Sequence, residues 1–122
     1  MAEHQQHIQM TDVDGVAVVR FLDRKITDEL VIQELGDELF QLVEARNLKK
    51  ILLNFTNVEF LSSAALGKLI SLERKVDRAG GMLRLSNIRT EIYDVFVITR
   101  LNEKFVITDE QEDALADFAS AE

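Results

Sequence analysis

Residues 50–67 read KILLNFTNVEFLSSAALG, and this stretch decides the fold. Its first part, 50–55, is a nearly continuous apolar run, which is typical of an interior strand covered on both faces. A turn over 56–61 follows, and the serines at Ser62 and Ser63 then precede an amphipathic pattern. Because serine is a preferred N-cap, we expect a helix to begin at one of these two serines.

Downstream of this stretch, helices and strands alternate. Gly80-Gly81 ends the first helix, and strands are expected at 82–86 and 105–107, with a short helix at about 91–100 between them. A last helix follows the second of these strands. Thr108 and Asp109 are expected to cap this last helix. The expected buried positions are Ala65, Leu69, Leu72, Val76 and Ala79 in the first helix. They are Ile92, Val95, Phe96 and Thr99 or Ile98 in the second helix, and Ala114, Leu115 and Phe118 in the third.

Upstream, two β-branched runs at 8–13 and 16–21 flank Asp14-Gly15, a pair suited to the positive φ angles of a tight hairpin turn. A polar link over 22–26 leads to another helix, which runs to about Arg46. Gly36 within this helix indicates a close packing contact. Thr27 is the expected N-cap, and the expected buried stripe is Val31, Leu35, Leu39, Leu42 and Val43.

The resulting element order is ββαβαβαβα, in which repeated βαβ units require parallel neighbouring strands. We therefore predict an α/β fold with a mixed, mostly parallel sheet, an N-terminal β-hairpin and about four helices. The 122 residues correspond to one domain over 1–122, with a flexible tail at about 1–6.

Composition excludes several classes of function. The net charge of −8 disfavours binding to nucleic acid and to anionic membrane surfaces. The chain has no cysteine, and it has neither a signal-peptide pattern nor an apolar run long enough to cross a bilayer. We expect a soluble, cytoplasmic protein without direct membrane insertion.

The chemistry of an active site is missing from the sequence. Neither a dinucleotide-binding glycine motif nor a phosphate-binding loop occurs. The two histidines, His4 and His7, are expected to be solvated residues of the N-terminal tail, and no further ligands complete a metal site. The prediction is therefore a protein that is not an enzyme and that needs no cofactor or metal.

The serine pair remains as the candidate functional feature. One serine is explained as a helix cap, which leaves the other hydroxyl available. Small side chains follow it, and these would let the backbone of another protein approach closely. A phosphate on such a serine would add a charge of about −1.5 to −2. We expect a partner-binding surface that comprises Phe60, Leu61, Ser62, Ser63, Ala64, Gly67 and Ser71.

The sequence resembles the STAS domain family, named for sulfate transporters and anti-sigma factor antagonists, over nearly its whole length. Three ordered segments carry the resemblance: 51–67 around the serines, 79–86 with its Gly-Gly turn and strand, and 95–101, which is similar to the short helix of the family. Around its switch the family commonly has Phe-x-Asp-Ser-Ser/Thr-Gly-Leu-Gly. Aligned on Phe60 and Leu66-Gly67, the phosphoacceptor position is Ser63, the Asp position is Ser62, and the next two positions are alanines.

The resemblance implies an anti-sigma factor antagonist that acts by partner switching. Unphosphorylated, such a protein binds an anti-sigma factor of the serine-kinase type. Phosphorylation by that kinase, at Ser63 or as second choice at Ser62, ends the interaction, and a serine phosphatase restores it. The alternative is a constitutive accessory subunit of a membrane transport or lipid-transfer complex, in which both serines are plain caps.

Overall fold

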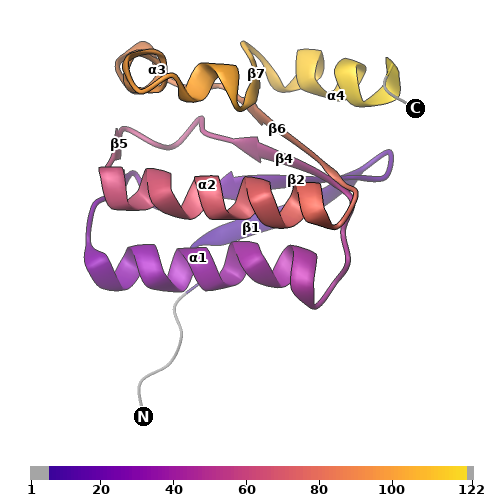
Figure 1. Cartoon of the computed structure of the whole chain (residues 1–122), viewed down its shortest axis with the longest axis horizontal. Helices are drawn as coiled ribbons and strands as arrows, with labels where there is room; N and C mark the ends of the chain where they lie inside the picture. The colour runs from indigo at the N-terminus through magenta and orange to yellow at the C-terminus, as the bar shows by residue number, and fades with distance from the viewer. Residues whose placement is uncertain (1–5, 121–122) are drawn as a thin grey trace.

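The computed structural model describes residues 6–120, which form a single α/β domain with seven strands and four helices (Figure 1). The predicted fold class is confirmed. A short 3₁₀ helix at Leu101–Glu103 and two very short strands, β3 and β5, add to the predicted order. The strands are β1 Ile8–Val13, β2 Val16–Phe21, β3 Lys25–Ile26, β4 Lys50–Asn54, β5 Phe60–Leu61, β6 Met82–Ser86 and β7 Val106–Thr108, and the helices are α1 Glu29–Glu44, α2 Ser63–Arg78, α3 Thr90–Ile98 and α4 Gln111–Ser120.

The main sheet has the strand order β1-β2-β4-β6-β7 and is parallel except for the antiparallel pair β1–β2. The hairpin turns where the sequence predicts it, with φ angles of 52° at Asp14 and 84° at Gly15. In the centre lies β4, whose residues Ile51, Leu52 and Leu53 are all 0% exposed. This confirms the interior strand, because only a strand covered on both faces loses all contact with water.

Helices cover the two faces of the sheet unequally. Figure 1 shows α1 and α2 side by side across one face, where the larger core also includes Ile92 and Phe96 of α3. The opposite face packs against α4, where Ala114 and Phe118 contact Val16, Val18 and Leu52. Alternate residues of β4 therefore belong to different cores, as the period of two in a strand requires.

The packing of α1 confirms most of the predicted stripe and corrects two details. Ile32 is buried in place of Val31, because Ile32 lies three residues before Leu35 and so on the same face of the helix. The N-cap is Asp28 rather than Thr27, since the Asp28 carboxylate accepts a hydrogen bond from Val31 N at 3.1 Å.

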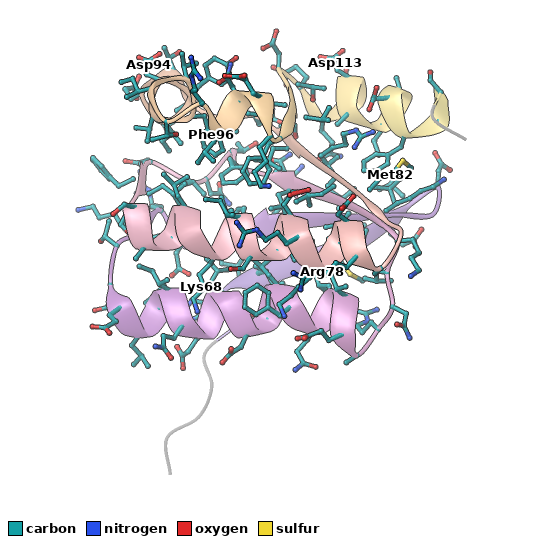
Figure 2. All side chains as sticks on the ribbon, viewed as in Figure 1. Lys68, Arg78, Met82, Asp94, Phe96 and Asp113 are labelled. Atoms are coloured by element: carbon teal, nitrogen blue, oxygen red, sulfur yellow. The ribbon has the colours of Figure 1, made fainter. Side chains whose placement is uncertain are left out.

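The close contact predicted at Gly36 is present between α1 and α2. The side chain of Lys68 lies directly across this glycine, and Figure 2 shows Lys68 between the two helices. A methyl group at Gly36 would lie 2.8 Å from Lys68 Cδ. The same lysine extends toward the ring of Phe40, with Nζ 5.8 Å from the ring centroid. Gly36 thus provides the space in which Lys68 crosses from α2 to α1.

The inner face of α3 is narrower than predicted. Ile92 and Phe96 are buried, and Figure 2 shows Phe96 directed into the domain. Val95 is 38% exposed and Ile98 is 80% exposed, so both predictions of burial were wrong; Thr99 is also exposed. The helix has only nine residues and continues into a 3₁₀ turn, so only one residue per turn faces the core.

Four further predicted positions are corrected, at Thr108, His7, Ala79 and Leu115. Thr108 ends β7 instead of capping α4, and its hydroxyl donates to Glu110 O at 3.0 Å. His7 is not a solvated tail residue, because it is only 1% exposed and makes hydrogen bonds to carboxylates. His4 and most of the predicted tail lie outside the described residues. Ala79 and Leu115 are partly rather than fully buried.

Candidate partner-binding site at the start of α2

A pair of two-residue strands positions the start of α2. β3 pairs in parallel with β5, with Lys25 opposite Phe60. The carbonyl of Arg24 accepts from Glu59 N at 2.7 Å and from Phe60 N at 3.1 Å. The carbonyl of Ile26 accepts from Ser62 N at 3.1 Å. Segments expected as a link and as a turn therefore form one small sheet, which fixes the backbone immediately before the helix.

The two serines have different structural roles. Ser62 is the N-cap of α2, and its Oγ accepts a hydrogen bond from Ala65 N at 3.2 Å. Ser63 is the first residue of the helix and is exposed. Its hydroxyl makes no hydrogen bond to any residue between 6 and 120. Ser62 is thus occupied in stabilising the helix end, whereas the Ser63 hydroxyl faces solvent.

The charge at the start of α2 differs from that of its neighbours. Acidic residues occupy the first turn of the other three α-helices within 6–120, at Glu29 in α1, Glu91 in α3, and Glu112 and Asp113 in α4. The first turn of α2 has none. A helix N-terminus carries a partial positive charge, and in α2 no acidic side chain of its own first turn balances this charge.

The predicted partner-binding residues are brought together on β5 and the first turns of α2. Phe60 is 53% exposed, and Ala64 and Gly67 are exposed. Leu61 and Ser71 are half-buried. Positions 64, 67 and 71 are three and four residues apart, which places them on one face of the helix. The surface has small side chains along α2 and one large aromatic ring at its edge.

A groove that the sequence analysis did not predict adjoins this surface. Its volume is about 280 Å³, and it separates β5 and the start of α2 from α3. The guanidinium of Arg89 at its rim donates from Nε to Val58 O at 3.1 Å. The residues that line it are apolar at Phe60, Leu61, Leu66, Ile92 and Val95, and charged at Glu59, Arg89 and Glu91. Val95 is exposed because it lines this groove. A sequence pattern cannot show that two elements distant in the chain leave a space between them.

Two further findings concern metal sites and membrane helices within the part of the chain that the structure describes. Within residues 6–120, no three His, Asp or Glu side chains are arranged to hold a metal ion. Over the same residues, no helix is both long enough and apolar enough to cross a membrane.

Solved structures share this architecture. An anti-sigma factor antagonist from Mycobacterium paratuberculosis superposes with a TM-score of 0.79 at 22% identity, covering 95% of this chain and 96% of that one. A STAS domain protein from Planctomyces limnophilus gives 0.82 at 18% identity, covering 92% and 97%. The phosphorylated form of the Bacillus cell fate determinant SpoIIAA gives 0.70 at 18% identity, covering 92% and 98%. At these identities the likeness shows the fold.

The sequence itself matches a family model. The model of the STAS domain matches residues 7–114, which include all seven strands, the first three helices and the start of α4. The match therefore includes the serine pair and the groove beside it. Since it extends over most of the chain, the protein belongs to the STAS domain family.

Proposed function

We propose that this protein is an anti-sigma factor antagonist that binds a serine-kinase anti-sigma factor through the start of α2 and is released by phosphorylation of Ser63. One observation carries the proposal: Ser62 Oγ caps the helix, while the adjacent Ser63 hydroxyl is exposed and unbonded. A kinase can reach Ser63 without dismantling the cap. The similarity in fold to antagonists of anti-sigma factors supports the same role.

The surface around Ser63 suits a protein partner. Ala64 and Gly67 lack bulky side chains, so a partner's backbone could approach α2 closely. Phe60 and the neighbouring groove offer apolar area, as the centres of protein interfaces do. Partner contact at this surface would enclose the Ser63 hydroxyl, which is the arrangement that a phosphate switch needs.

Phosphorylation is expected to break binding and to leave the domain folded. A phosphate adds a charge of about −1.5 to −2 and a strong hydration shell, which a docked partner would have to displace. At the same position the α2 dipole favours negative charge, typically by about 0.3–1 kcal/mol. No acidic side chain in the first turn opposes the added charge. A phosphatase that removes it would restore the interface.

The proposed role is binding rather than catalysis. A serine nucleophile needs an adjacent general base, and His7 is the only histidine within residues 6–120. That histidine is buried, and both of its ring nitrogens lie within hydrogen-bond distance of carboxylates. The Ser63 hydroxyl accordingly has no histidine base beside it among residues 6–120, and a kinase that phosphorylates it would supply the base that activates this hydroxyl.

The direct test is to incubate the protein with its cognate kinase and ATP and to map the phosphate by mass spectrometry. We expect one phosphate on Ser63 in the wild type and in Ser62→Ala, and none in Ser63→Ala. Ser62→Ala is the matched control because it removes the neighbouring hydroxyl. Phosphate on neither serine would contradict the switch. Affinity purification that recovers a transporter instead of a kinase would support the accessory-subunit alternative.

A further inference from the structure

His7 directly precedes β1 and is enclosed by the segment that follows β2 and by α1. It is 1% exposed, and its carbonyl accepts from Leu22 N at 2.9 Å, which extends the β1–β2 pairing by one step. Its ring contacts Asp23, which follows β2, and Glu34 of α1. A single buried imidazole thus joins the edge of the sheet to the first helix.

The ring geometry indicates the protonation state. Nδ1 lies 2.6 Å from Asp23 Oδ2, and Nε2 lies 2.9 Å from Glu34 Oε1. An ionised carboxylate can only accept hydrogen bonds, whereas a neutral imidazole can donate from only one nitrogen. Both contacts are satisfied together when His7 carries a proton on each nitrogen. The arrangement is therefore that of an imidazolium between two carboxylates.

A third carboxylate, that of Glu38, adds negative charge beside the imidazolium. Both oxygens of Glu38 accept from His7 N at 3.0 Å, and Oε1 also accepts from Ile8 N at 3.3 Å. Burial acts to lower the pKa of His7. Hydrogen bonds to Glu34 and Asp23 and the charges of Asp23 and Glu38 outweigh burial, so that the pKa of His7 lies above its ordinary value.

The segment held by His7 is the one that positions the serines. Asp23 directly precedes Arg24, whose carbonyl accepts from Glu59 N and Phe60 N. Arg24 Nε also donates to Glu59 Oε2 at 2.6 Å. Two residues further on, Ile26 O accepts from Ser62 N. The backbone from Asp23 to Ile26 is therefore hydrogen-bonded to the imidazole ring at one end and to the start of α2 at the other.

We propose that His7 is a pH-sensitive clasp: its imidazolium holds the segment 22–26 in place, and loss of one ring proton loosens the β3–β5 pair and the start of α2. The groups that face His7 in the clasp are Asp23 after β2 and Glu34 and Glu38 on α1. Deprotonation would remove the positive charge that lies between Asp23 and Glu34 and one of the two hydrogen bonds that the ring donates to them. The inference concerns the fold itself and holds for any partner of the α2 surface.

The direction of the pH effect follows from the raised pKa of His7. A group whose pKa is higher in the folded state stabilises that state fully at pH values below its unfolded pKa, about 6.5 for histidine. The stabilisation is lost as the pH rises through the higher folded value. The clasp is therefore closed in mildly acidic solution and opens toward alkaline pH.

The experiment is hydrogen exchange of the amides of Glu59, Phe60 and Ser62, followed by NMR at about pH 6 and about pH 9 and converted to protection factors. Because deprotonation removes a charge-assisted hydrogen bond, we expect these amides to lose protection at least about tenfold at the higher pH, equivalent to about 1.4 kcal/mol. The amide of Leu53 in the central strand is the internal reference and should keep its protection. Equal protection of the three amides at both pH values would overturn the proposal.

Two variants separate the clasp from a general loss of stability. His7→Gln removes the titrating group, so the three amides should be less protected at about pH 6 and should show no further step with pH. The control is Glu112→Gln, which removes an exposed carboxylate on α4 and should retain the wild-type step. If His7→Gln does not fold, Asp23→Asn removes one partner at a side chain that is 31% exposed. In that variant the step should move to lower pH, and an unmoved step would contradict the assignment to His7.

Discussion

The starts of α1 and α2 achieve the same backbone geometry with different electrostatics. In α1 the carboxylate of Asp28 accepts from Val31 N at 3.1 Å, and in α2 the hydroxyl of Ser62 accepts from Ala65 N at 3.2 Å. Both side chains thus bond to the amide three residues ahead. The α1 start also carries Glu29 in its first turn, whereas the first turn of α2 is neutral.

Under the proposed function, the start of α1 is a purely structural helix end and the start of α2 is the end at which binding is regulated. At α1 two negative charges already balance the positive end of the helix, so a further charge would meet repulsion. At α2 the balance is missing, and the exposed Ser63 lies where a negative group would supply it. The weaker start is the one suited to regulation, because its charge can be changed without a competing side chain.

The largest expected effect is on partner affinity. Ser63→Asp should lower the affinity for the proposed anti-sigma partner by about thirtyfold or more, equivalent to about 2 kcal/mol, because it would enclose an unpaired charge in the proposed interface. Ser63→Ala should stay within about threefold of the wild type, equivalent to about 0.6 kcal/mol. Isothermal titration calorimetry measures both. Ser120→Asp, which adds the same charge on α4, is the control, and an equal loss in this variant would show a nonspecific charge effect.

Removing the two caps should have an intermediate effect on stability. Asp28→Ala is expected to lower the free energy of unfolding by about 1–2 kcal/mol, since it removes both a hydrogen bond and a favourable charge. Ser62→Ala removes only the hydrogen bond and should cost about 0.5–1 kcal/mol. Urea unfolding followed by circular dichroism compares the two. A larger loss for Ser62→Ala would reverse the proposed ranking of the helix starts.

The smallest effect tests the missing charge directly. Ser63→Asp should raise the free energy of unfolding by about 0.3–1 kcal/mol through the α2 dipole, even though it weakens partner binding. Glu29→Ser is the matched change at α1 and should lower stability by a similar amount. Thermal unfolding at low and high salt would show whether both effects are screened. Destabilisation by Ser63→Asp would mean that α2 does not favour negative charge.

The sequence predicted correctly those features of the fold that depend on residues close together in the chain. Asp14-Gly15 marks its hairpin turn because two successive positive φ angles suit these residues, and the structure has both. The start of α2 at Ser62-Ser63 was equally accessible, since capping depends on residues three positions apart. The local pattern could not decide which serine caps the helix and which is exposed, because both residues are serines and either hydroxyl can serve as a cap.

The features that were missed depend on contacts between distant residues. β3 and β5 have two residues each, too few for any period to be recognised, and they are stabilised by pairing across 35 positions. His7 looked like a tail residue because its partners, Asp23 and Glu34, lie 16 and 27 positions away. The groove arises between β5, α2 and α3, so its existence depends on the tertiary arrangement alone.

The crossing of Lys68 over Gly36 has a consequence for evolution and for design. A single added carbon at Gly36 would lie 2.8 Å from Lys68 Cδ, so the flexible lysine chain would have to shift, and the three nearest neighbours of the added carbon are all atoms of that side chain. Among related sequences, a larger residue at 36 should therefore coincide with a redirected or shorter residue at 68. Comparing many homologues would reveal this as covariation, and a redesign of α1 at Gly36 should allow Lys68 to take another path.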